Sequence, residues 1–108
     1  MSKELKEVEK LLIKYLESSN KNKQNIARSA TLRQIKGLCE ICKNILLGNL
    51  PLDNIQKESL NRHKRKIRKF ADTAIPLKVK KRAVGQRGGW LGPVAAVALP
   101  FIASLLRK

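Results

Sequence analysis

The chain has 108 residues, a length typical of a single domain, and carries a net charge of +16. Its four aromatic residues are scattered, so it lacks the stacking platform with which single-strand-binding proteins hold bases. The N-terminal residues contain no apolar core region of the kind that a signal peptide has, and we expect an intracellular protein.

Apolar residues recur at helical spacing through the first 75 residues and predict an all-α fold. The predicted helices cover residues 3–18, 22–29, 32–46 and 54–74. The third and fourth helices begin at capping-box patterns, Thr31 with Gln34 and Asp53 with Gln56. Short connections favour antiparallel neighbours, so we expect a small three- to four-helix bundle over residues 1–75. Its core is small, and self-association or packing into a larger assembly would stabilise it.

The two cysteines, Cys39 and Cys42, form a CxxC inside the apolar pattern of the third helix. A zinc site needs four ligands, and the chain has no second cysteine pair and only one histidine, His63. We therefore predict two core thiols, no metal and no other cofactor. His63 lies on the apolar side of its helix, which favours a half-buried histidine with a backbone partner over a pH sensor.

Positive charge is concentrated in residues 59–89, which hold eleven Lys/Arg and one acidic residue, Asp72. Residues 76–89 begin with a proline and contain three glycines toward their end, Gly85, Gly88 and Gly89, and we expect an extended basic arm there. A solvated lysine surface would explain the charge without a ligand, but the clustering favours non-specific binding to the phosphates of double-stranded DNA. The candidate phosphate contacts are Arg62, Lys64, Arg65, Lys66, Arg68, Lys69, Lys78, Lys80, Lys81, Arg82 and Arg87.

The last segment, residues 90–108, has seventeen uncharged residues followed by Arg107 and Lys108. As a helix, this uncharged run reaches about 26 Å at about 1.5 Å per residue, which is shorter than the hydrocarbon core of a bilayer. We expect a helical tail that inserts into an anionic membrane interface; a core helix that packs on the bundle and a simple anchor are the alternatives. The candidate membrane-active residues are Trp90, Leu91, Pro93, Val94, Val97, Leu99, Pro100, Phe101, Ile102, Leu105 and Leu106.

Gly88 and Gly89 separate the arm from the tail. They are either a flexible hinge or an extended, side-chain-free stretch that a narrow protease cleft accepts, so that cleavage after Gly89 would free the tail. No acid pair, nucleophile–base set or phosphate-binding loop is visible in the sequence, and we expect a protein that is not an enzyme.

Three segments together carry a family resemblance: IKGLCEICKNILLGNLPL, NRHKRKIRKFAD and IPLKVKKRAVGQRGGWLGPVAAVALPFIASLL. The chain beyond about residue 22 resembles a small basic protein of Polinton/Maverick elements and adintoviruses. This resemblance implies a minor virion or core component, similar in layout to the adenoviral core peptide. It also implies an adenovirus-like protease as a partner that cleaves at Gly88–Gly89, although Gln86 stands where that protease prefers an aliphatic residue.

The leading hypothesis is therefore a viral structural protein, a minor capsid or core component that binds DNA and carries a membrane-active tail. Its partners would be double-stranded DNA, an anionic membrane, and capsid proteins or further copies of itself. We expect it in the virion, and in the host nucleus or cytoplasm during assembly. Two alternatives remain: a DNA-binding regulator whose tail is a packing helix, and a tail-anchored membrane protein with a basic juxtamembrane segment.

Overall fold

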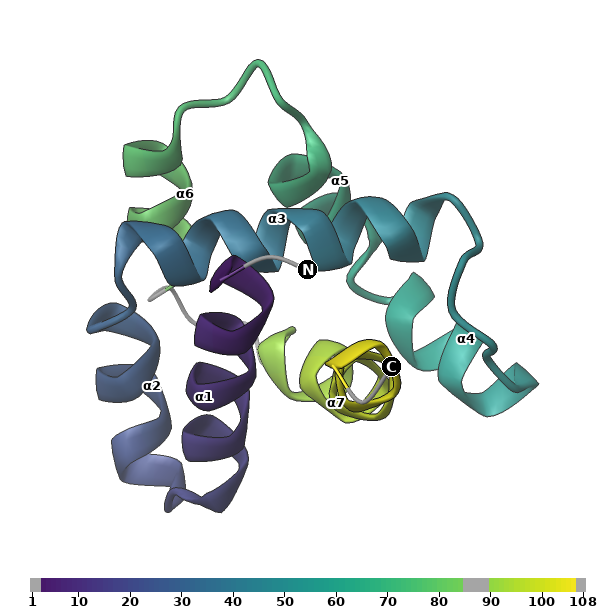
Figure 1. The fold of residues 1–108 in the computed structure, drawn as a ribbon, viewed down its shortest axis with the longest axis horizontal. Helices are drawn as coiled ribbons and strands as arrows, with labels where there is room; N and C mark the ends of the chain where they lie inside the picture. The colour runs from purple at the N-terminus through teal and green to yellow at the C-terminus, as the bar shows by residue number, and fades with distance from the viewer. Residues whose placement is uncertain (1–2, 85–89, 107–108) are drawn as a thin grey trace.

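The computed structural model describes residues 3–84 and 90–106, and within these ranges the chain forms seven α-helices and no strand (Figure 1). The helices are α1 (Lys3–Glu17), α2 (Asn20–Arg28), α3 (Leu32–Leu46), α4 (Asn54–Asn61), α5 (Lys64–Ala71), α6 (Leu77–Val84) and α7 (Leu91–Leu106). The all-α fold predicted from the sequence is confirmed.

Helix α3 lies at the centre of the fold. Figure 1 shows it running across the molecule, with α1, α2 and α7 on one side and α5 and α6 on the other. Accordingly, α3 contacts α1, α5 and α6. Because two groups of helices cover it, α3 buries residues around much of its circumference, including Ile35, Leu38, Ile41 and Cys42.

A glycine allows α1 and α3 to approach each other closely. A Cβ atom at Gly37 would meet the backbone carbonyl oxygen of Glu4 and would lie 3.0 Å from the Cβ of Val8. Any larger residue at this position would therefore push α1 away from α3. Gly37 is buried, and it belongs to the contact on which the hydrophobic core is built.

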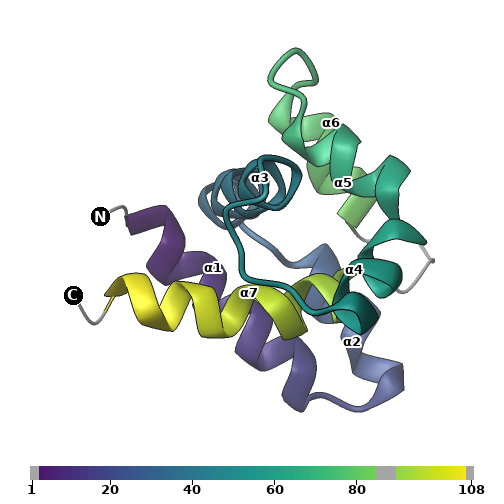
Figure 2. The same cartoon turned by 90° about the vertical axis from the view of Figure 1, so that its right-hand side faces the viewer.

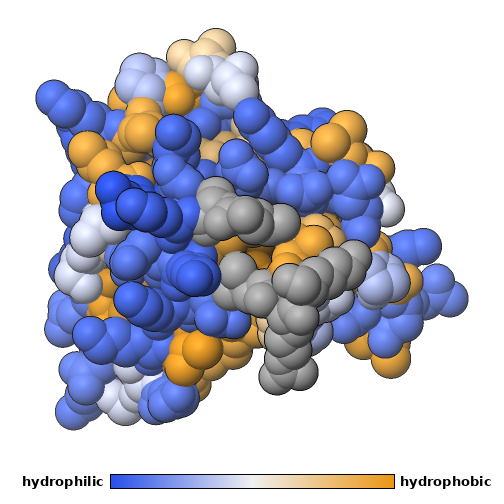
Figure 3. All heavy atoms as spheres, viewed as in Figure 1, coloured by the Kyte–Doolittle hydropathy of each residue, from blue (hydrophilic) through white to orange (hydrophobic). Residues whose placement is uncertain are grey.

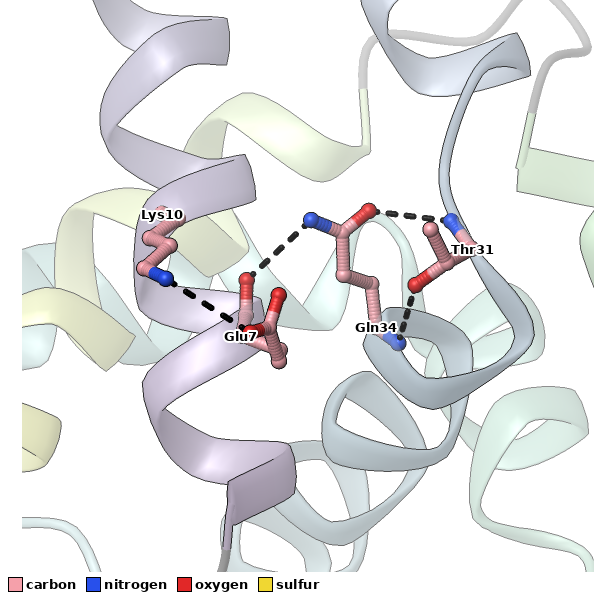
Figure 4. Close-up of polar contacts among 4 residues, drawn as sticks. All are labelled: Glu7, Lys10, Thr31 and Gln34. Carbon is pink, nitrogen blue, oxygen red and sulfur yellow. Dashed lines mark hydrogen bonds and ion pairs between the residues drawn. The ribbon is translucent and has the colours of Figure 1, made fainter.

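Both predicted capping boxes are present. At the start of α3, the Gln34 backbone N–H donates to Thr31 Oγ1 at 3.1 Å, and Thr31 N–H donates to Gln34 Oε1 at 2.9 Å (Figure 4). Gln34 Nε2 also donates to the backbone carbonyl of Glu7 at 3.3 Å, which connects α3 to α1. At the start of α4, Gln56 N–H donates to Asp53 Oδ1 at 2.8 Å. These bonds satisfy amides that a helix start otherwise leaves unpaired.

The prediction of a single helix over residues 54–74 is wrong in one respect. In the structure this segment is divided into α4 and α5. The chain leaves helical geometry at His63, whose backbone has φ −113° and ψ 21°. The break turns the two halves toward different partners: α4 contacts α7, whereas α5 packs on α3. One continuous straight helix would not reach both surfaces.

The extended arm predicted over residues 76–89 is also incorrect for its described part, since Leu77–Val84 form α6. Pro76 stands directly before α6, and its carbonyl accepts from the N–H groups of Val79 and Lys80 at 3.1 and 3.2 Å. Proline fits a helix start because no intrahelical partner is needed for its missing N–H. Helix α6 buries Ala83 and Val84 and contacts α2 and α3. Residues 85–89 lie outside the described residues.

The C-terminal segment is helical, as expected, but it is packed into the bundle. Figure 2 shows α7 passing beneath α3, and α7 contacts both α1 and α4. One face of α7 is buried, with Val94, Ala98 and Ile102 fully inaccessible to solvent. The division into a bundle at 1–75, an arm at 76–89 and a separate tail at 90–108 therefore does not describe the hydrophobic core, which includes residues of both α6 and α7.

Candidate nucleic-acid interface

Helix α5 carries the densest group of cationic side chains in the described chain. Ile67 and Phe70 are buried and hold the helix on the core. The Phe70 ring lies 4.6 Å from the Trp90 ring, centroid to centroid, at an interplanar angle of 43°. With this face fixed, the opposite face presents Arg65 and Arg68 to solvent. The fold thus orients the charges of α5 outward.

The break between α4 and α5 creates a concave surface among these charges. A cleft of about 520 Å³ is lined by Asn61, Arg62, His63, Lys64, Arg65, Lys66 and Arg68. Five of these residues are Lys or Arg, and none is acidic. We call this set the α4–α5 cationic surface. A single straight helix would spread the same residues along a convex surface, so the turn at His63 gathers them.

Four of the five cations on this surface have no carboxylate partner among the described residues. In the part of the chain that the structure describes, Arg62, Lys64, Arg65 and Arg68 have no ion-pair partner. The one acidic residue between positions 59 and 89, Asp72, accepts a hydrogen bond from the backbone N–H of Ala74 at 2.9 Å. Because unpaired like charges repel one another, a bound polyanion would lower the energy of this surface.

The remaining predicted phosphate contacts lie in two places. Lys69 is half-buried on α5, and Lys78, Lys81 and Arg82 are on α6. The α6 residues lie beside Arg28 of α2, with which they line a second concave surface. Arg28 is not among the residues predicted from the sequence, because it stands far from the basic segment and only the contact between α2 and α6 brings it there. Arg87 lies outside the described residues.

Lys80 has to be removed from the predicted phosphate contacts. Its side chain is only 3% exposed, and its Nζ donates a hydrogen bond to the backbone carbonyl of Asp72 at 2.7 Å. The ammonium group also interacts with the thiol of Cys39. The helical geometry of α6 explains this placement, because Lys80 shares the inner side of the helix with Ala83 and Val84.

Both cysteines are buried, as the sequence predicts. Burial raises the pKa of each thiol, and at Cys39 the neighbouring Lys80 opposes this rise. A thiol is a nucleophile and a metal ligand only as the thiolate, so burial keeps both groups unreactive. We assign them to core packing.

The candidate membrane-active residues are mostly in the core. Trp90, Leu91, Val94, Val97 and Ile102 are buried, whereas Pro93, Leu99, Phe101 and Leu105 are half-buried. Pro100 is exposed, and Leu106 is the last residue of α7. None of the described helices has both the length and the apolar character needed to cross a bilayer. The predicted cleavage point, Gly88–Gly89, lies outside the described residues.

The outer surface of the protein is mostly polar on the face that Figure 3 shows. The face of the molecule in Figure 3 is largely hydrophilic, with smaller hydrophobic areas between the polar side chains.

Comparison with known proteins provides no assignment, since no protein-family model, curated protein or solved structure matches the chain.

Proposed function

We propose that the protein binds double-stranded DNA without sequence specificity, through phosphate contacts made by the α4–α5 cationic surface. The observation that supports this most directly is the cleft lined by five Lys and Arg residues and no acid. The buried anchors Ile67 and Phe70 hold these residues on one outward face. Such a surface requires no enzyme chemistry, and the proposed role is structural.

The chemistry of the surface favours the phosphate backbone over the bases. Its cationic side chains are those that neutralise phosphates and release counterions. Single-strand binding would need aromatic platforms on which bases stack. Phe70 and Trp90, two of the four aromatic residues, are buried against each other and cannot stack on bases.

The salt dependence of duplex binding by the full chain tests this proposal. In the test variant, Arg62, Arg65 and Arg68 are replaced together by glutamine; all three are exposed. If each contacts one phosphate, the slope of log K against log salt concentration should fall by about 2.7, at about 0.9 per phosphate on duplex DNA. Affinity should decline to a similar degree for unrelated duplex sequences.

The matched control replaces Lys3, Lys6 and Lys14, which are exposed. They belong to α1, a helix on the other side of α3 from α5 (Figure 1). It removes the same net charge from a surface that is not proposed to bind DNA. An equal loss of slope in both variants would mean that net charge alone, and not the α4–α5 cationic surface, governs binding. Wild-type protein without a salt-dependent affinity for DNA would refute the proposed function.

We further propose, on the resemblance to the small basic proteins of Polinton/Maverick elements and adintoviruses, that this DNA-binding role belongs to a virion component. Such a protein would bind packaged DNA as a minor capsid or core protein. Genes for a capsid protein, a packaging ATPase and an adenovirus-like protease beside the gene of this chain would support the proposal. A cellular regulatory gene in an unrelated neighbourhood would favour the alternative of a DNA-binding regulator.

The packing of α7 favours one part of that alternative, in which the tail is a packing helix. Its buried residues belong to the same core cluster as those of α1 and α3. The membrane-active role of residues 90–108 remains a separate proposal, because it requires α7 to leave this cluster.

A further inference from the structure

A second cationic cleft lies between α2 and α6, at some distance in sequence from the α4–α5 cationic surface. It has a volume of about 370 Å³ and is lined by Arg28, Lys78, Lys81 and Arg82. We call it the α2–α6 cleft. All four lining residues are cationic, and the two helices that supply them contain no acidic residue.

The fold builds this cleft by bringing α2 and α6 together. The two helices lie at the same end of α3, on opposite sides of it, and are in contact (Figure 1). Each buries a small residue in the core, Ala27 from α2 and Ala83 from α6. Small buried residues allow helix backbones to approach closely, so the longer cationic side chains beside them converge on one concave surface.

One hydrogen bond fixes part of the cleft. Lys81 Nζ donates to the backbone carbonyl oxygen of Arg28 at 3.2 Å. Arg28 is in the last turn of α2, where carbonyl groups lack intrahelical partners and attract cations. Lys81 is thereby held beside Arg28, while Arg28, Lys78 and Arg82 remain exposed. The cleft is therefore both positioned by the fold and open to solvent.

Four cations that converge without a carboxylate repel one another, and an anion is the species that relieves this repulsion. The two arginines have planar guanidinium groups that can each bind two oxygens of a phosphate, and the lysines contribute point charges. We propose that the α2–α6 cleft is a phosphate-binding site, separate from the α4–α5 cationic surface, in which Arg28 and Arg82 are the principal contacts.

The phosphate can come from the backbone of a nucleic acid or from a soluble polyphosphate. If the phosphate belongs to a nucleic acid, this proposal rests on the proposed function, because the cleft is then a second place where the same DNA is bound. In the second case it is an independent site. Both sources present phosphate oxygens with the same chemistry, and two arms of one experiment distinguish them.

The experiment uses the full chain and the double variant Arg28→Gln/Arg82→Gln. Both positions are exposed, so the fold should be retained, and thermal unfolding checks this. The control is Lys3→Gln/Lys6→Gln on α1, which removes equal charge. The first arm measures the salt dependence of binding to a DNA duplex. The second measures binding of inorganic tripolyphosphate by calorimetry.

A decrease of the DNA salt slope by about 1.8 in the cleft variant alone supports the site with nucleic acid as the source of phosphate. A loss of tripolyphosphate affinity of tenfold or more in the cleft variant alone supports the site with a soluble polyphosphate as the source. The site is refuted if the cleft variant matches the control in both arms. If the wild type binds tripolyphosphate but no DNA, the proposed function is refuted, and the tripolyphosphate arm alone decides whether the cleft binds phosphate.

Discussion

Replacing Ile102 by alanine tests whether α7 belongs to the folded core. The Ile102 side chain is 0% exposed, in a helix that contacts α1 and α4. Removing its outer carbon atoms costs about 2.4 kcal/mol in transfer free energy, at about 0.8 kcal/mol per carbon. The cavity that remains adds to this, and such substitutions cost about 2–5 kcal/mol in total. A domain is stable by only about 5–15 kcal/mol, so the loss should be large.

Urea unfolding of the full chain, monitored by circular dichroism, measures this effect. The urea concentration at the midpoint should fall. In thermal unfolding, the melting temperature should decrease by more than about 10 °C for a domain of this size. Ala96→Ser is the control, because Ala96 is exposed on the same helix. If Ile102→Ala unfolds at the same urea concentration as this control, the packing of α7 contributes nothing to the stability of the fold.

Three further predictions concern the interior. Gly37→Ala should destabilise the protein by about 1–3 kcal/mol in the same urea assay, because the new methyl group meets the Glu4 carbonyl; unchanged stability would show that α1 can shift at no cost. Cys42, whose pKa is raised by burial, should react with a thiolate-specific reagent only as fast as the protein unfolds, and rapid reaction of the native protein would contradict its burial. Lys80→Met should leave the salt slope of DNA binding unchanged, whereas a decrease of about 0.9 would return Lys80 to the interface.

The helix starts and much of the core could be predicted from sequence because they depend on local patterns. A capping box joins residues three positions apart, so Thr31 with Gln34 marks the start of α3 before any tertiary contact is known. The apolar stripes of α1 and α3 likewise follow from helical periodicity, and their buried residues include Leu5, Val8 and Leu38.

The path of the chain after residue 60 depends on tertiary contacts and could not be predicted in this way. The break at His63 follows from the separate partners of α4 and α5, which local spacing does not reveal. The same limit affects the candidate site. Lys80 and Lys81 are neighbours in a cationic run, yet one is buried and the other lines a cleft. Arg28 joins that cleft only through the packing of α2 on α6.

A membrane role for α7 has to use the side chains that now hold the bundle together. Trp90, Val94 and Ile102 are already removed from water by the protein, so their transfer into lipid gains little hydrophobic free energy. The driving force would have to come from attraction between the cationic surface and anionic lipids, at about 1 kcal/mol per Lys or Arg near the membrane. Insertion would therefore compete with folding, and a weaker bundle should insert more readily.

This competition can be measured without altering the tail. Leu12 of α1 is 0% exposed, and Leu12→Ala should weaken the core while leaving α7 unchanged in sequence. If α7 acts on membranes, the variant should release dye from anionic vesicles faster than the wild type does, and neutral vesicles should show a smaller effect. If the destabilised variant leaves anionic vesicles intact, even at urea concentrations that unfold it, α7 serves only as a packing helix.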